Sequence, residues 1–222
     1  MNSPILNESS RTTHYQREKN KVLKNTYLLL SMTLLFSGAM AAVSMAMNIP
    51  HPGLLMTLVG FFGLLFAISK FQNSSLGIVL VFALTGFMGI TLGPILNAYL
   101  SLPGGSSIIM NAMGATGAIF LGLSAYVVTT KKDFSFMSGF LAVGILVGFL
   151  AGLGAYFFEM PGLSLAVSAM FVLLMSGLIL YETSNIVNNG ETNYVMATTT
   201  LFISIFNLFT SLLHLLGFMN QE

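Results

Sequence analysis

Residues 162–187 read GLSLAVSAMFVLLMSGLILYETSNIV, a long and almost continuously apolar run. It holds a single charged residue, Glu182, and is longer than the ~20 residues with which a helix crosses the ~30 Å hydrocarbon core of a bilayer. Charged residues make up 7% of the whole chain, whereas a soluble surface needs roughly a quarter. The sequence therefore predicts that lipid surrounds this protein.

Six further apolar runs of similar length fill most of the chain. We predict an all-α integral membrane protein with seven transmembrane helices. The predicted spans are 26–47, 53–70, 76–100, 107–130, 136–158, 162–187 and 194–218.

The basic residues predict how the chain is oriented, because cytoplasmic loops retain Lys and Arg close to the membrane. All eight fall on one side of the predicted spans, which places the N-terminus in the cytoplasm and the short segment 219–222 in the periplasm. They are Arg11, Arg17, Lys19, Lys21, Lys24, Lys70, Lys131 and Lys132.

The largest predicted extramembrane piece is the N-terminal tail, residues 1–25. It is rich in Asn, Ser, Thr and charge and has few apolar residues, which is typical of disorder. We expect it to be the segment that a cytosolic partner holds. The alternative is that the tail only orients the chain and rests on anionic lipid. The candidates for engaging a partner are Arg11, Arg17, Lys19, Lys21 and Lys24.

Motifs for catalysis are missing from the sequence. It has no His-Glu pair at metalloprotease spacing, no nucleophile elbow, no phosphate-binding Gly-Lys loop and no dinucleotide fingerprint. The three His residues are far apart in the sequence, and the absence of Cys excludes thiolate metal sites. We predict that the protein is not an enzyme and uses no cofactor.

Glycines at four-residue spacing occur in the third and fifth spans, where small residues let helix backbones approach closely. Gly89 and Gly93 form one such row, and Gly144, Gly148 and Gly152 form the other. We expect these rows to face neighbouring helices of the same chain.

Glu182 is the candidate functional residue, because an acidic side chain inside hydrocarbon costs about 2.5–3.5 kcal/mol to insert and is a functional hypothesis by default. We predict a proton- or cation-responsive site there. The alternative is that Glu182 merely reaches the wet interface. The candidate companions of Glu182 are Asn185, Ser204, Asn207 and Lys70.

Four passages of the sequence carry a resemblance to a known family. Residues 92–99, 124–133, 180–194 and 201–209 resemble bacterial members of the transmembrane Bax inhibitor motif family, in the same order along the same predicted topology. The resemblance spans the chain and implies a seven-helix bundle of the bacterial inner membrane, with the last helix near its centre.

The resemblance implies two functions. Similar bacterial proteins associate with the membrane-anchored AAA protease FtsH, both as substrate and as a modulator that restrains it, and residues 1–25 fit the handle that such a protease needs. Other members of the family conduct calcium in a pH-dependent leak through paired aspartates, which align with Glu182 and Ser204. Ser204 cannot ionise, so the paired-carboxylate switch is incomplete in this chain. We therefore predict an FtsH modulator. The alternatives are a calcium or proton leak centred on Glu182, and a purely structural membrane scaffold.

Overall fold

The computed structural model describes residues 4–189 and 193–220, with side chains described for residues 20–188 and 193–220. Seven helices within this part of the chain are long and apolar enough to cross a membrane, so the predicted all-helical, seven-span architecture is confirmed. The elements are α1 (Pro4–Ala46), α2 (Leu54–Phe71), α3 (Ser75–Leu100), α4 (Gly105–Thr130), the 3₁₀ turn η1 (Ser135–Met137), α5 (Ser138–Phe157), α6 (Pro161–Ser184), the π-helical turn η2 (Asn185–Asn189) and α7 (Tyr194–Met219).

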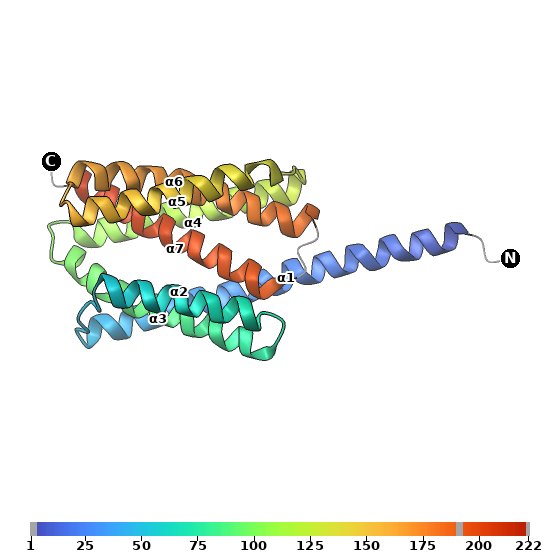
Figure 1. Ribbon diagram of the computed structural model, residues 1–222, viewed down its shortest axis with the longest axis horizontal. Coiled ribbons are helices and arrows are strands. Elements are labelled where there is room, and N and C mark those ends of the chain that lie inside the picture. The colour runs from blue at the N-terminus through green and yellow to red at the C-terminus, as the bar shows by residue number, and fades with distance from the viewer. Residues whose placement is uncertain (1–3, 190–192, 221–222) are drawn as a thin grey trace.

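The helices form two groups with α7 between them. Figure 1 shows α1, α2 and α3 on one side, α4, α5 and α6 on the other, and α7 crossing obliquely through the middle. The helix contacts agree, since α7 packs against α6, α4, α1 and α3. The expectation that the last helix lies near the centre of the bundle is confirmed.

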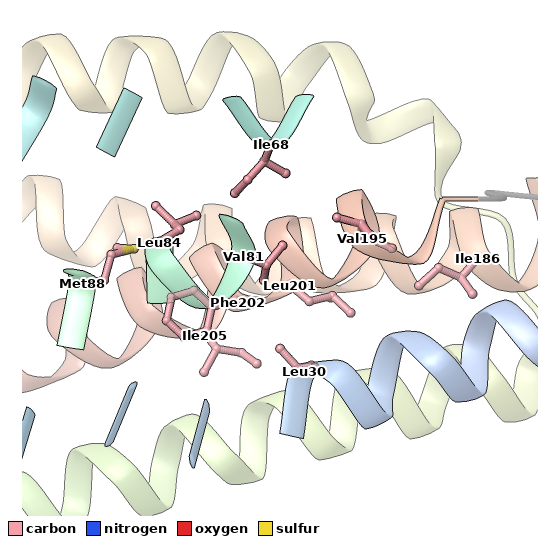
Figure 2. Packing of buried hydrophobic residues seen from close by; sticks show 11 residues of the cluster. Leu30, Ile68, Val81, Leu84, Met88, Ile186, Val195, Leu201, Phe202 and Ile205 are labelled. Carbon is pink, nitrogen blue, oxygen red and sulfur yellow. The ribbon is translucent and has the colours of Figure 1, made fainter. Parts of the chain in front are cut away.

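The main apolar core forms where α7 meets the first group and the end of α6. Figure 2 shows Phe202 and Leu201 of α7 among side chains from α1, α2 and α3. Ile186 of η2 joins the same cluster, so the end of α6 is tied to this core. Because lipid surrounds the outer surface, α2 and α5 bury few of their apolar side chains inside the bundle.

The structure differs from the predicted disordered tail, because α1 is helical from Pro4 onward and projects from the bundle at the end where the chain begins (Figure 1). Between Pro4 and Gly38 the sequence contains no other Pro or Gly. It is instead rich in Glu, Gln, Lys and Arg, which favour helix, and Pro is well suited to the first turn. Polar composition therefore concealed a helix that continues into the first span.

The glycine rows face helices of the same chain, as expected. A Cβ added at Gly89 would overlap the carbonyl oxygen of Ser37 on α1, and one added at Gly93 would overlap the Ser44 hydroxyl. On α5, a Cβ at Gly144 would lie 2.6 Å from the Leu174 side chain of α6. The rows thus set close α1–α3 and α5–α6 contacts.

Asn193 holds the start of α7 in place. Its Oδ1 accepts hydrogen bonds from the backbone N–H groups of Val195 (3.0 Å) and Met196 (3.1 Å). Its Nδ2 donates to Asn73 Oδ1 at 2.9 Å, which connects α7 to the α2–α3 loop.

Replacing Asn193 by alanine should lower stability, because losing an N-cap costs about 1–2 kcal/mol. For a chain of this size that corresponds to a melting temperature roughly 2–8 °C lower, measured on detergent-solubilised protein. Asn193→Asp is the control, since it keeps the cap acceptor and loses the Nδ2 donor to Asn73 Oδ1 and to the Gln72 carbonyl oxygen. A melting temperature unchanged in Asn193→Ala would show that the cap does not stabilise α7.

Candidate functional site

The candidate site lies where α6 ends and passes into η2, at the end of the bundle where α1 enters it. Glu182 is buried there, with 7% of its side chain exposed, and the next two residues, Thr183 and Ser184, are fully buried. The π-helical turn η2 continues directly from α6, and π-helical turns within helices are frequent at functional sites. The carboxylate therefore lies within the protein rather than at its lipid or water surface.

Hydroxyl groups connect this end of α6 to two other helices. The Thr183 hydroxyl lies 3.4 Å from the Tyr27 hydroxyl of α1 and 3.5 Å from the Ser124 hydroxyl of α4. The Thr198 hydroxyl of α7 donates to the carbonyl oxygen of Thr26 at 3.3 Å. Four helices thus meet around the segment that carries Glu182.

The loop between α4 and α5 closes the site from the outside. The backbone N–H of Phe134 donates to Ser184 Oγ at 2.9 Å, and Asn188 Nδ2 donates to the carbonyl oxygen of Lys132 at 2.9 Å. A hydrogen bond from Lys132 to the Tyr126 side chain, whose ring centre is 5.5 Å from Lys132 Nζ, raises the pKa of Lys132. Because the raised pKa favours its protonated form, Lys132 stays positively charged at neutral pH.

The Thr26 side chain carries a buried polar group near the site. Its Oγ1 is buried and has no hydrogen-bond partner in the described part of the structure. Leaving a buried hydroxyl unpaired costs about 1–3 kcal/mol, so such a group commonly meets a water or an ion.

Two of the four predicted companions of Glu182 are Asn185, on the same segment, and Ser204, on α7. Asn185 follows Glu182 on the same segment, and its backbone N–H donates to the carbonyl oxygens of Tyr181 and Glu182. The Ser204 hydroxyl is fully buried but donates along its own helix to the Thr200 carbonyl oxygen at 2.8 Å. The single hydroxyl proton of Ser204 is therefore used within α7 rather than offered to Glu182.

The other two predicted companions of Glu182 are Asn207 on α7 and Lys70 at the end of α2. Asn207 Nδ2 donates to the Ile203 carbonyl oxygen at 2.9 Å, and its side chain lines an apolar cavity on the α2–α5 side of α7. Lys70 is exposed at the end of α2, with Nζ 5.8 Å from the centre of the Phe71 ring. α2 packs mainly against α3, whereas α6 packs against α4, α5 and α7.

Among the five basic residues proposed to engage a partner, Lys21 and Lys24 are exposed on α1 close to where it joins the bundle. The side chains of Arg11, Arg17 and Lys19 lie outside the described part of the structure, as do residues 221–222 of the C-terminal segment. Sequence reasoning missed Tyr27 and Ser124. The available signal was that both are polar groups inside apolar spans.

Comparison with known proteins gives consistent matches over nearly the whole chain. The family described as "Inhibitor of apoptosis-promoting Bax1" matches residues 19–221. The chain is 50% identical to the "Modulator of FtsH protease YccA" of Escherichia coli K12, over 91% of this chain and 92% of that protein. It is 55% identical to an uncharacterized Pseudomonas aeruginosa protein over 91% of each chain, and 48% identical to an uncharacterized membrane protein of Vibrio cholerae over the full length of both.

Proposed function

Because this chain belongs to the Bax inhibitor family and is a multi-pass protein of the bacterial inner membrane, we propose that it modulates an FtsH-type protease, restraining it and also serving as its substrate. The observation that carries the proposal is the 50% identity with YccA over 91% of this chain. The names of these relatives describe a modulator and membrane proteins rather than an enzyme, so the proposed action is through protein–protein contact.

The shape of α1 supports this proposal. Its N-terminal turns extend beyond the bundle, away from the other helices (Figure 1). Helices depend mainly on tertiary packing for their stability, so a projecting polar helix unfolds at little cost. A processive protease therefore finds in it a segment that it can unwind and pull. In this proposal the N-terminus faces the cytoplasm, as the Lys and Arg pattern predicts.

The packing of α1 also supports the proposal that this protein restrains the protease. A protease that pulls on the N-terminal turns next meets α1 inside the bundle, where α1 makes its most extensive contacts with α3 and also packs on α7. Unfolding must then proceed through a packed membrane helix. The protease would remain occupied by this chain and spare other substrates.

A direct test measures the lifetime of another membrane-protein substrate of the protease in cells. Raising the level of this protein should slow degradation of that substrate, with the protease concentration unchanged. Degradation at an unchanged rate would contradict the proposed modulation. An unrelated seven-helix membrane protein expressed to the same level is the control for crowding of the membrane.

The second candidate function is a cation or proton leak, which the burial of Glu182 and the unpaired Thr26 hydroxyl favour. A carboxylate and nearby hydroxyls are oxygen ligands that suit calcium or a transferred proton. One carboxylate supplies fewer anionic oxygens than calcium sites usually gather. For this reason the leak stays the second candidate.

Glu182→Gln tests the leak, because the amide neither binds a cation by charge nor releases a proton. If the leak exists, calcium or proton flux into vesicles containing the variant should fall to that of protein-free vesicles. Glu159→Gln, which neutralises an exposed residue of the α5–α6 loop, is the matched control and should conduct like the unmodified protein. Equal flux through Glu182→Gln and the unmodified protein would rule out the leak.

A further inference from the structure

A cavity of about 400 Å³ separates α1 from α4 in the half of the bundle away from the projecting end of α1. At its inner end the two helices meet at Tyr27 and Phe120, whose ring centres are 6.0 Å apart. Phe206 and Phe209 of α7 form its floor. We call this cavity and its two flanking helix faces the α1–α4 seam.

The seam opens sideways into the membrane. Gly38 and Ala42 of α1 and Met113 of α4 line the cavity and are also exposed on the outside of the bundle. All three lie within spans that are long and apolar enough to cross a membrane. Whatever occupies the seam therefore approaches through the bilayer.

The glycines at the seam have no packing partner. Within the described part of the structure, a Cβ built at Gly38 or at Gly117 would meet no atom within 4 Å. The rows on α3 and α5 behave differently, since each meets a neighbouring helix at Gly89 and Gly144. Small residues let a helix backbone come close. The seam therefore has small residues typical of a helix–helix contact, but no helix of the described structure packs on them.

Ser37 gives an independent sign that the seam is incomplete. Its side chain lines the cavity and is only 5% exposed, yet its hydroxyl makes no hydrogen bond within the described part of the structure. On the facing wall, the Thr116 hydroxyl is satisfied by the Ala112 carbonyl oxygen at 2.7 Å. In membranes Ser commonly bonds to a side chain of another helix, so a helix in the seam could satisfy the Ser37 hydroxyl.

We propose that the α1–α4 seam receives one transmembrane helix of the protease, which packs on Gly38 and Gly117 and offers a polar side chain to Ser37. This inference rests on the proposed function. An acyl chain would fill the cavity but could not hydrogen-bond Ser37. A helix supplies both the apolar surface and the polar group.

The position of α1 favours the protease over a second copy of this chain. The same helix lines the seam and extends from the bundle as the segment that the protease is proposed to hold. Binding at one end of α1 raises the effective concentration of the membrane anchor of the protease at the other. A second copy of this chain would not be held by the projecting end of α1, so its effective concentration at the seam would not be raised in this way.

Site-specific cross-linking tests the seam, and the absence of Cys makes single-cysteine variants unambiguous. A cysteine-directed photo-cross-linker is placed at Ala42 in otherwise unmodified membranes. The control carries it at Val59 of α2, which is 66% exposed and also lies within a span. We expect an adduct with the protease from Ala42 and not from Val59. Equal adducts at both positions, an adduct between two copies of this chain, or adducts with lipid alone would each overturn the inference.

Filling the seam provides a second variant. Gly117→Leu should reduce the Ala42 adduct about tenfold, which corresponds to ~1.4 kcal/mol of lost packing. Gly63→Leu is the matched control, because a Cβ at Gly63 on α2 also meets nothing within 4 Å. Both variants should keep the normal melting temperature. An Ala42 adduct that Gly117→Leu leaves unchanged would overturn the inference.

The failures of the two proposals are distinguishable. If the protease copurifies with the protein but no adduct forms from Ala42, the seam inference fails and the proposed function stands. If the protease does not copurify at all, the proposed function fails and the seam inference fails with it.

Discussion

Gly89→Leu should destabilise the protein more than any other single substitution considered. The Cβ alone would overlap the Ser37 carbonyl oxygen and lie 3.1 Å from the Met40 Cβ, so the backbones of α1 and α3 must separate. Overpacking costs typically 1–3 kcal/mol, and here backbone must move as well, so we expect a loss of ~3 kcal/mol or more. At roughly 2–4 °C per kcal/mol, the melting temperature in detergent should fall by about 6–12 °C.

The control for this experiment is Gly63→Leu, which adds the same side chain on α2 where nothing lies within 4 Å. It should melt within ~2 °C of the unmodified protein. Similar melting temperatures for Gly89→Leu and Gly63→Leu would show that α1 and α3 are not in close contact at Gly89. In cells, loosening α1 from α3 should also speed extraction of the chain by the protease.

Deleting residues 1–19 should give the largest functional effect. The remaining chain keeps the whole first span from Asn20 to Ala46, together with Lys21 and Lys24 to hold the orientation. Without the projecting turns the protease has nothing to unwind. Pulse-chase measurement in cells should then give the deleted protein the half-life that the full chain has when the protease is inactive.

A second variant separates a handle from a charge contact. Changing Arg11, Arg17 and Lys19 to Gln keeps the length and the helix-forming residues but removes three positive charges. If the segment acts as a handle, this variant is degraded at the normal rate. If it acts through charge, the variant is as long-lived as the deletion. A normal half-life for the deletion itself would contradict both, and would leave the tail as a segment that orients the chain.

The sequence was sufficient for the membrane architecture because the strongest signal is a long apolar run, and each of the seven spans carries one. The Gly89–Gly93 and Gly144–Gly152 rows were also interpretable, since small residues at four-residue spacing have one main use in a membrane bundle. The helix over residues 4–25 was missed because low hydrophobicity was taken as disorder. The lack of Pro and Gly after Pro4 was the signal for a helix.

The surroundings of Glu182 could not be derived from the sequence. Tyr27 and Thr183 are 156 residues apart and Ser124 and Thr183 are 59 apart, so their meeting depends on how four helices pack. Lys70 was predicted as a companion because its expected depth in the membrane is similar to that of Glu182. Equal depth does not show which helices are neighbours in the bundle. The α1–α4 seam is likewise invisible in the sequence, because Gly38 and Gly117 are unremarkable until their neighbours are known to be absent.

Binding of the protease is tested directly by affinity purification of the tagged protein from membranes in mild detergent, with and without residues 1–19, scored for the FtsH-type protease by mass spectrometry. We predict that the protease is recovered with the full chain and that recovery falls sharply when residues 1–19 are deleted. Absence of the protease from the full-chain sample, with the protein itself intact and folded, would contradict the proposed function and direct attention to ion flux at Glu182.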